Sequence, residues 1–368
     1  MKEKNKRLLS IDALRGFDMF FISGGASFLY LIKGKTDLAW VNFLVEQVEH
    51  PAWNGFTFFD FIMPLFLFIS GVSLSFSLSR NLMKDVSKSD LYKKAFKRML
   101  ILIVLGIIYK NAPIPLFEPS KIRFSSVLGR IGIATFITTL LYLNYTNKQR
   151  LYWISGILIA YYAALFLIPV PGYGAGDLSF EGNLVGWIDR GIMPGRLSQG
   201  TFDQLAITTH LPSICLTIFG AWAGEILQNQ SFNNNKKLLN LVITGTLIVA
   251  IGLVWSLHFP INKHLWTSSF ILLTSGLGFL ILALFFWLID VLGYRKWAFF
   301  FKVIGVNSLV IYFAYSFINF GYTSNKIFGG LLSPIDEKWH EALISIGSLG
   351  LVWLFLYILY RNKIFVKI

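Results

Sequence analysis

Apolar runs of about 20 residues recur along this chain from near its first residue to its last, and no polar stretch between them is long enough for a separate soluble domain. A helix needs about 20 apolar residues to cross the hydrocarbon core of a bilayer. Of the 368 residues, 55% are hydrophobic and only 14% are charged, which is more apolar surface than a soluble core could hide. The sequence therefore predicts an all-α, polytopic transmembrane helical bundle that forms a single domain over residues 1–368 and has the lipid bilayer as its surroundings.

We expect about ten spans by length and hydropathy. They cover residues 10–32, 55–79, 99–110, 124–145, 151–170, 205–227, 238–259, 266–289, 299–320 and 343–360. The first run follows a basic tail but contains Asp12, Arg15 and Asp18 and has no small-residue cleavage site, so we expect it to be retained as a span. The third run is short and leads into a proline-rich stretch, 111–119, that is typical of a broken or re-entrant segment.

The lysines and arginines predict how the bundle is oriented. About two thirds of the 33 fall in the loops that share a side with the N-terminus, so the positive-inside rule places both termini in the cytoplasm. Outer loops 33–54 and 171–204 are then on the opposite side, where their length is typical of functional loops. The formal net charge of +14 lies in short loops between spans, so we predict no nucleic-acid partner.

A histidine and a carboxylate stand together at the mouth of the second predicted span. His50 precedes Pro51, which disfavours a helical conformation at His50. Asp60 lies about one to two turns below the predicted helix start at Gly55, and Pro64 removes the backbone hydrogen bond to its carbonyl. A histidine whose tautomer is set by a carboxylate is the minimal equipment for a general base. The alternatives are an exposed loop histidine and a structural ion pair between helices.

Other polar side chains inside predicted spans are candidates for holding a ligand. Arg15 and Arg130 each require a carboxylate, backbone carbonyls or the anionic groups of a ligand. Asp12, three residues before Arg15, is the alternative partner on the same helix face. Asn307 and Ser308 either hydrogen-bond between helices or bind a ligand.

Seven motifs, in order along nearly the whole chain, resemble the heparan-alpha-glucosaminide N-acetyltransferase family. These multispan enzymes use cytosolic acetyl-CoA to acetylate a glucosamine on the far side of the membrane. The motifs are SIDALRG at 10–16, HPAWNG at 50–55 with Asp60 and Pro64, VLGRIG at 127–132, GWIDR at 186–190, PINKHLW at 260–266, GVNS at 305–308 and YILYRNKIF at 357–365.

The resemblance implies roles for individual residues. His50 matches the catalytic histidine of the family, Asp60 its nearby acid, and Arg130 an arginine associated with CoA. We predict acetyl-CoA as the co-substrate, with no metal, and an amino-sugar acceptor. The predicted cofactor-binding residues are Arg15, Arg130, Asn307 and Ser308, and the predicted substrate-binding residues are Asn54, Trp187, Asp189 and Asn262.

The chain also departs from the family pattern. Ser23-Gly24-Gly25 stands where animal members have an asparagine near the active site, and His264 stands where an asparagine is usual. The loop before His50 is longer, and we expect the chain to lack the large N-terminal lumenal domain of the animal members. We therefore expect a bacterial-type member in the inner (cytoplasmic) membrane, with an acceptor whose identity stays open.

The expected reaction is acetyl transfer to the amine of a glucosamine-type sugar on the periplasmic side, with His50 as general base. Direct transfer in a ternary complex and an acetyl-histidine intermediate are the two routes. A sugar permease is an alternative, because ten spans with a broken segment also suit a transporter. An O-acetyltransferase that acts on a surface glycan is a further alternative. A homodimer is also possible by sequence.

Overall fold

A computed structural model describes residues 8–366, so the predicted basic tail at 1–7 lies outside the described residues. Within 8–366 the chain forms helices joined by loops, and its extended pairing is confined to two isolated bridges, Arg123 with Gly195 and Val170 with Gly174. The prediction of an all-α fold is confirmed.

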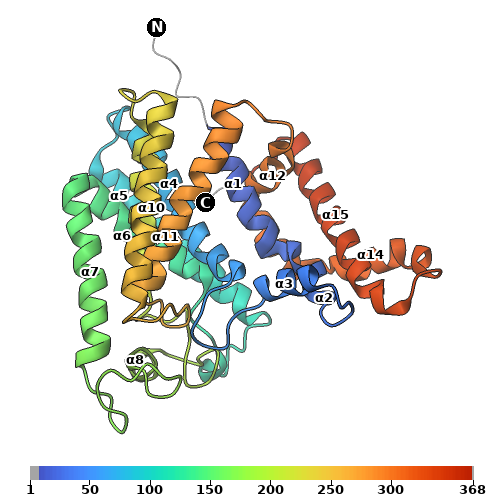
Figure 1. Ribbon diagram of the computed structural model, residues 1–368, viewed down its shortest axis with the longest axis horizontal. Coiled ribbons are helices and arrows are strands. Elements are labelled where there is room, and N and C mark those ends of the chain that lie inside the picture. The colour runs from blue at the N-terminus through green and yellow to red at the C-terminus, as the bar shows by residue number, and fades with distance from the viewer. Residues whose placement is uncertain (1–7, 367–368) are drawn as a thin grey trace. The chain divides into compact units, whose positions relative to one another are not determined.

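Figure 1 labels the main helices along the chain. Their internal contacts divide them into two compact units. Within the described residues, the first unit comprises 8–51, 57–62 and 282–366, and the second comprises 52–56 and 63–281. The first unit contains α1 (Leu9–Phe20), α2 (Ser27–Leu31), α3 (Ala39–Gln47), α12 (Ala298–Gly305), α13 (Ser308–Phe317), α14 (Phe320–Phe328) and α15 (His340–Arg361). The second contains α5 (Lys88–Asn111), α6 (Val127–Asn144), α7 (Asn147–Leu167), α8 (Leu184–Ile192), α9 (His210–Gln228) and α10 (Asn234–Ser256). Helix α4 (Phe58–Leu82) begins in the first unit and continues in the second, and α11 (Ser268–Phe286) does the reverse.

Among the described residues, seven helices are long and apolar enough to cross a membrane. They are α4, α6, α7, α9, α10, α11 with its continuation to Val291, and α15 with the turn before it. The pair α12 and α13, bent by 70°, would make an eighth span. The sequence predicted about ten, and the two that differ are 10–32 and 99–110.

Each difference has a local cause. The run 10–32 does not form one continuous helix, because a π-helical turn at Phe21–Gly25 follows α1 and Gly24 adopts a φ of +91°. That φ lies in the left-handed region that glycine tolerates best. The run 99–110 is the apolar end of α5, whose first half carries lysines and Arg98 and so lowers its hydropathy.

Two glycines allow α1 and α12 to pack backbone to backbone. A Cβ added at Gly16 would collide with the carbonyl oxygen of Phe301, and one added at Gly305 would collide with that of Asp12. The ring of Phe17 packs edge-on against Phe301 at 5.6 Å beside this contact. Small residues at such contacts let membrane helices approach closely.

We expect Gly16→Ala to destabilise the protein by about 3 kcal/mol, because the new methyl group must displace the backbone of α12. Gly156→Ala in α7 is the matched control, since a Cβ there meets open space within 4 Å. Thermal unfolding in detergent should show a clearly lower Tm for the first variant and an unchanged or higher Tm for the second. Equal Tm values would contradict this packing.

Candidate active site: a histidine–aspartate pair beside a cleft

The carboxylate of Asp60 is fixed by the start of α4. Thr57 is the residue before the helix, and its backbone N–H donates to Asp60 Oδ2 at 3.0 Å. A threonine followed three residues later by an acid is a pattern typical of helix N-termini. The Thr57 hydroxyl also donates to the Glu49 carbonyl at 2.7 Å, which ties down the residue before His50.

The helix therefore begins at Phe58 and not at the predicted Gly55, and the Asp60 carboxylate in its first turn accepts a hydrogen bond from the Thr57 N–H just before it. Asp60 lies in the first turn of α4, so the predicted depth of one to two turns below the helix start is wrong. This shift brings the carboxylate level with the extended segment that precedes the helix.

His50 reaches Asp60 from that segment. Its Nδ1 lies 2.7 Å from Asp60 Oδ1. The Asp60 side chain is 1% exposed and the His50 side chain is 45% exposed, so a buried carboxylate supports a ring that solvent can reach. A neutral histidine that donates its Nδ1–H to a carboxylate carries its lone pair on Nε2. This geometry suits a general base.

The His50 ring lies at one wall of a cleft of about 730 Å³ in the first unit. The break after α1 also lines the cleft, through Phe21, Ile22 and Gly24. The remaining lining residues are Ala26, Ser27, Tyr30, Leu31, Val48, Glu49 and Phe59. A cleft of this size is within the range of small-molecule sites.

The second unit holds the rest of the predicted motif. Asn262 is buried and donates through its side-chain nitrogen to Asn54 Oδ1 at 3.0 Å. The side-chain oxygen of Asn262, Oδ1, accepts from the backbone N–H of Leu265 at 2.8 Å. Trp53 stacks on His264 with ring centroids 5.1 Å apart. The predicted substrate-binding pair Asn54 and Asn262 is thus brought into direct contact.

The family model described as heparan-alpha-glucosaminide N-acetyltransferase, catalytic, matches residues 7–260, which include His50, Asp60, Asn54 and Arg130. The chain belongs to this family. It is 28% identical over 422 residues to heparan-alpha-glucosaminide N-acetyltransferase of Homo sapiens and 26% identical over 421 residues to that of Mus musculus. Each alignment covers 98% of this chain, which spans 60% of the length of these relatives.

Arg130, the arginine of the fourth predicted span, is fully buried in α6. Its Nη2 donates to the carbonyl of Gln204 at 2.8 Å and to the Thr209 hydroxyl, and its guanidinium lies 4.2 Å from the Trp266 ring centroid. Among residues 8–366, neither its Nε nor its Nη1 finds a hydrogen-bond partner. Buried N–H groups without a hydrogen-bond partner are suited to donate to an oxygen of a ligand.

Trp187 and Asp189 share the family motif GWIDR but lie in different environments on α8. Trp187 is 43% exposed, whereas Asp189 is buried. Thr208 donates to Asp189 Oδ1 from its backbone N–H at 3.1 Å and from its hydroxyl at 2.8 Å. Burial raises the pKa of Asp189, and the hydrogen bonds from Thr208 lower it. Burial has the larger effect, so the pKa is raised to about 6. The two predicted substrate-binding residues do not converge on one point.

A pH-dependent stability follows from Asp189. Its pKa in the folded protein is raised above the value near 3.9 of an unfolded chain, so its favourable contribution is present at low pH and is lost as the pH rises through about 6. Asp189→Asn removes the buried charge and keeps an acceptor for Thr208. We expect the Tm of the variant minus the Tm of the wild type to be about 3 °C larger at pH 7.5 than at pH 5. The same difference at both pH values would contradict the buried charge.

A polar cluster centred on Asp203 was not among the predicted sites. Arg123 donates to both Asp203 oxygens at 2.8 Å, and Ser125 donates at 2.5 Å. Burial acts to raise the pKa of Asp203, but the hydrogen bonds from Arg123 and Ser125 outweigh it and hold the pKa below its usual value. The backbone N–H groups of Ser198 and Leu205 also donate to this carboxylate. The cluster fixes the end of loop 171–204.

The other predicted cofactor-binding residues lie in the first unit. Arg15 Nη1 lies 3.5 Å from Asp12 Oδ1, the alternative partner considered above. Asn307 donates to the Ile364 carbonyl at 3.0 Å and accepts from the backbone N–H of Val366 at 3.3 Å, which favours a structural role. Ser308 is the first residue of α13. Their binding of acetyl-CoA stays a prediction.

Proposed function

We propose that this chain is a transmembrane acetyltransferase that moves the acetyl group of acetyl-CoA to the amine of a glucosamine-type sugar. One observation carries the proposal, namely the hydrogen bond between a buried Asp60 and Nδ1 of a half-exposed His50 in the wall of a cleft. Membership of the heparan-alpha-glucosaminide N-acetyltransferase family supports the reaction class. We assign the catalytic roles to these two residues and the amino-sugar acceptor to the cleft.

In the proposed mechanism, His50 Nε2 accepts the proton that the acceptor amine loses as its nitrogen attacks the thioester carbonyl carbon. Asp60 stabilises the imidazolium that forms and holds the ring in place. The carbon–sulfur bond then breaks, and the imidazolium returns the proton to the departing sulfur. The products are the amide and the free thiol of CoA, and His50 is again neutral. This is the direct route, without an acetyl-histidine.

We assign contacts with acetyl-CoA within each unit separately. We assign Arg130 to a carbonyl oxygen of acetyl-CoA, because two of its buried nitrogens find no hydrogen-bond partner in the described part of the chain. Arg15, near the start of α1, is the proposed contact of the CoA phosphates. Asn54 remains a predicted substrate-binding residue of the second unit.

The sidedness of the reaction follows from charge. The phosphates of CoA cannot enter a hydrocarbon core about 30 Å thick, whereas its mostly neutral arm can pass between helices. We propose that both termini are cytoplasmic, that the protein is multi-pass in a bacterial inner membrane, and that loops 33–54 and 171–204 form the acceptor side. Acetyl-CoA then binds from the cytoplasm and the sugar from the periplasm.

An acceptor screen tests this proposal. The detergent-purified protein is mixed with radiolabelled acetyl-CoA and with glucosamine, N-acetylglucosamine or glucose, and labelled sugar and free thiol are quantified together. We expect thiol release and an amide product with glucosamine alone. Ester products on the neutral sugars would support the O-acetyltransferase instead, and the absence of any labelled sugar would refute acetyl transfer.

A further inference from the structure

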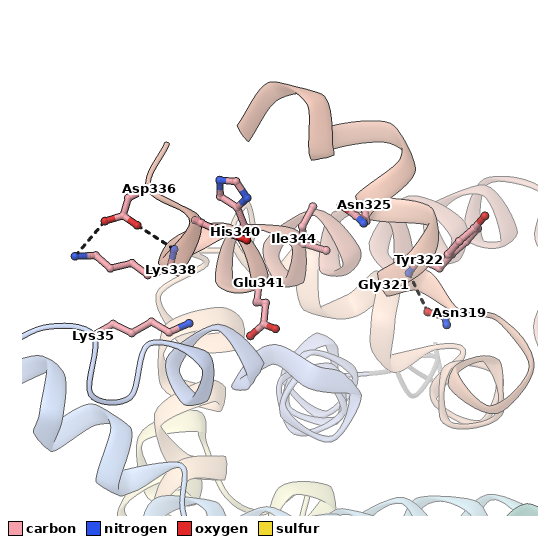
Figure 2. A pocket seen from close by; sticks show the side chains of 11 residues that line it. Lys35, Asn319, Gly321, Tyr322, Asn325, Asp336, Lys338, His340, Glu341 and Ile344 are labelled. Carbon is pink, nitrogen blue, oxygen red and sulfur yellow. Dashed lines mark hydrogen bonds and ion pairs between the residues drawn. The ribbon is translucent and has the colours of Figure 1, made fainter. Parts of the chain in front are cut away.

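A cleft of about 230 Å³ in the second unit, between the start of α7 and the second half of α9, has a buried arginine in its wall. Figure 2 shows a larger cleft of the first unit, about 940 Å³, but none of its lining residues is buried and Asp336 there pairs with Lys338. We call the smaller one the α7–α9 cleft. Its lining includes Lys148, Arg150, Leu151, Ile154 and Trp222.

The guanidinium of Arg150 is buried but only partly engaged. Its side chain is 7% exposed, and its Nη2 donates to Glu225 Oε1 at 2.6 Å and to Asn147 Oδ1. The guanidinium lies 4.5 Å from the ring centroid of Tyr142. Among residues 8–366, neither its Nε nor its Nη1 finds a hydrogen-bond partner. An unpaired buried donor costs free energy, so a ligand oxygen that accepts from Arg150 would be stabilising.

The charge of the α7–α9 cleft favours an anion. Glu225 offsets the charge of Arg150, whereas Lys148 is exposed and forms no ion pair within the described residues. One positive charge in the lining is therefore left uncompensated. A phosphate diester carries one negative charge and offers oxygens that accept from both kinds of donor.

The start of α7 has the features of a helix end at the membrane surface. The helix opens with a polar capping box formed by Thr146 and Gln149. Tyr145, Tyr152 and Trp153 next to it are exposed, which is typical of the aromatic belt at lipid headgroups. Only 28% of the apolar window of α7 is buried inside the protein, so lipid can contact this helix.

The apolar part of the lining suits the carbons that follow a headgroup. Leu151, Ile154 and Trp222 provide it, and Leu151 is 42% exposed. At about 230 Å³ the cleft is smaller than most small-molecule sites. It therefore has room for a phosphate and its first carbons, while the acyl chains would lie outside it along α7.

We propose that the α7–α9 cleft binds the headgroup of one anionic phospholipid. An unpaired N–H of Arg150 donates to a phosphate oxygen, and Lys148 balances the negative charge. Loop 171–204 follows the opposite end of α7, so the orientation proposed above places this site in the cytoplasmic leaflet, where anionic lipids attract basic residues. Only the choice of leaflet rests on the proposed function.

Lipid binding can be measured without acetyl-CoA or acceptor, by mass spectrometry of the intact full chain in detergent. Phosphatidylglycerol should bind at least about fivefold more tightly than phosphatidylcholine with the same acyl chains. Lys148→Gln should weaken the binding of phosphatidylglycerol about fivefold. Arg150→Lys should weaken it about tenfold, because a lysine can keep the pair with Glu225 but lacks the two unpaired N–H groups.

Lys88→Gln is the matched control. Lys88 is exposed in the first turn of α5, as Lys148 is in the first turn of α7, and it lies outside the cleft. Its affinity for phosphatidylglycerol should stay within about twofold of wild type. Because Lys148 is exposed, Lys148→Gln should fold normally, so the test does not depend on the stability of Arg150→Lys.

Three results would overturn the α7–α9 cleft as a phospholipid site. The first is equal affinity of the wild type for the two lipids. The second is equal weakening by Lys88→Gln and Lys148→Gln, which would indicate a general attraction to the basic surface. The third is displacement of bound phosphatidylglycerol by coenzyme A, which would assign the cleft to the phosphates of that molecule. A failure of acetyl transfer would alter none of these measurements.

Discussion

Replacing His50 with alanine is expected to lower kcat by roughly a thousandfold, because the acceptor amine then loses its only proposed proton acceptor. KM for acetyl-CoA should change little, since His50 acts on the amine. The loss takes one hydrogen bond from the buried Asp60 carboxylate, but Thr57 still donates to it, so Tm should fall only modestly. Steady-state kinetics of the purified variant, together with its melting curve, measure all three quantities.

His258→Ala is a suitable control for this experiment. His258 is a histidine of the second unit that hydrogen-bonds Tyr162, outside the His50 cleft. Its substitution should leave kcat within about twofold. If His50→Ala kept more than about a tenth of wild-type kcat, general-base catalysis by this residue would be excluded.

Asp60→Asn is expected to have the second largest effect, a loss of at least about a hundredfold in kcat. An asparagine has nearly the same shape and still offers an oxygen to Thr57, but its NH2 group favours the histidine tautomer with the lone pair on Nδ1. That tautomer turns the proton-bearing nitrogen of His50 toward the substrate. The charge that stabilises the imidazolium is lost as well.

A purely structural role for Asp60 predicts a different result, namely a lower Tm with kcat largely retained. Asp90→Asn separates the two, because Asp90 occupies the corresponding first-turn position of α5, where Ser87 donates to its carboxylate at 2.8 Å. Both variants should lose up to about 1 kcal/mol of stability. Only Asp60→Asn should lose activity.

Much of the site could be predicted because its signals are local in sequence. The Pro51 rule kept His50 out of the helix, and the apolar run placed Asp60 beside it. The exact helix start was also readable, since Thr57 and Asp60 form a capping pattern. The predicted depth of Asp60 was wrong because the helix begins at Phe58, three residues after Gly55.

The break in the first span was harder to predict. The run 10–32 is apolar enough for a membrane helix, and a glycine pair within such a run is common in spans. What ends the helix is the left-handed backbone at Gly24. The short helix α2 that follows packs Phe28 and Leu29 against a core that includes Ala342 of α15. The cleft beside His50 exists because of this break.

Long-range pairs left no signal in the sequence. Arg123 and Asp203 are 80 residues apart, and each was only a charge near a loop before the fold brought them together. Trp187 and Asp189 show the opposite problem. The segment 171–204 was predicted as a loop, but it contains helix α8. Residues two apart on a helix point in nearly opposite directions, so only one of these two side chains is buried.

The most direct test of the account is a sided assay in proteoliposomes. Vesicles whose cytoplasmic protein face is outward receive radiolabelled acetyl-CoA outside and glucosamine inside. The account predicts labelled N-acetylglucosamine in the lumen with the wild type and none with His50→Ala. Glucosamine that crosses unmodified without acetyl-CoA, with no labelled sugar formed, would contradict acetyl transfer and point to a permease.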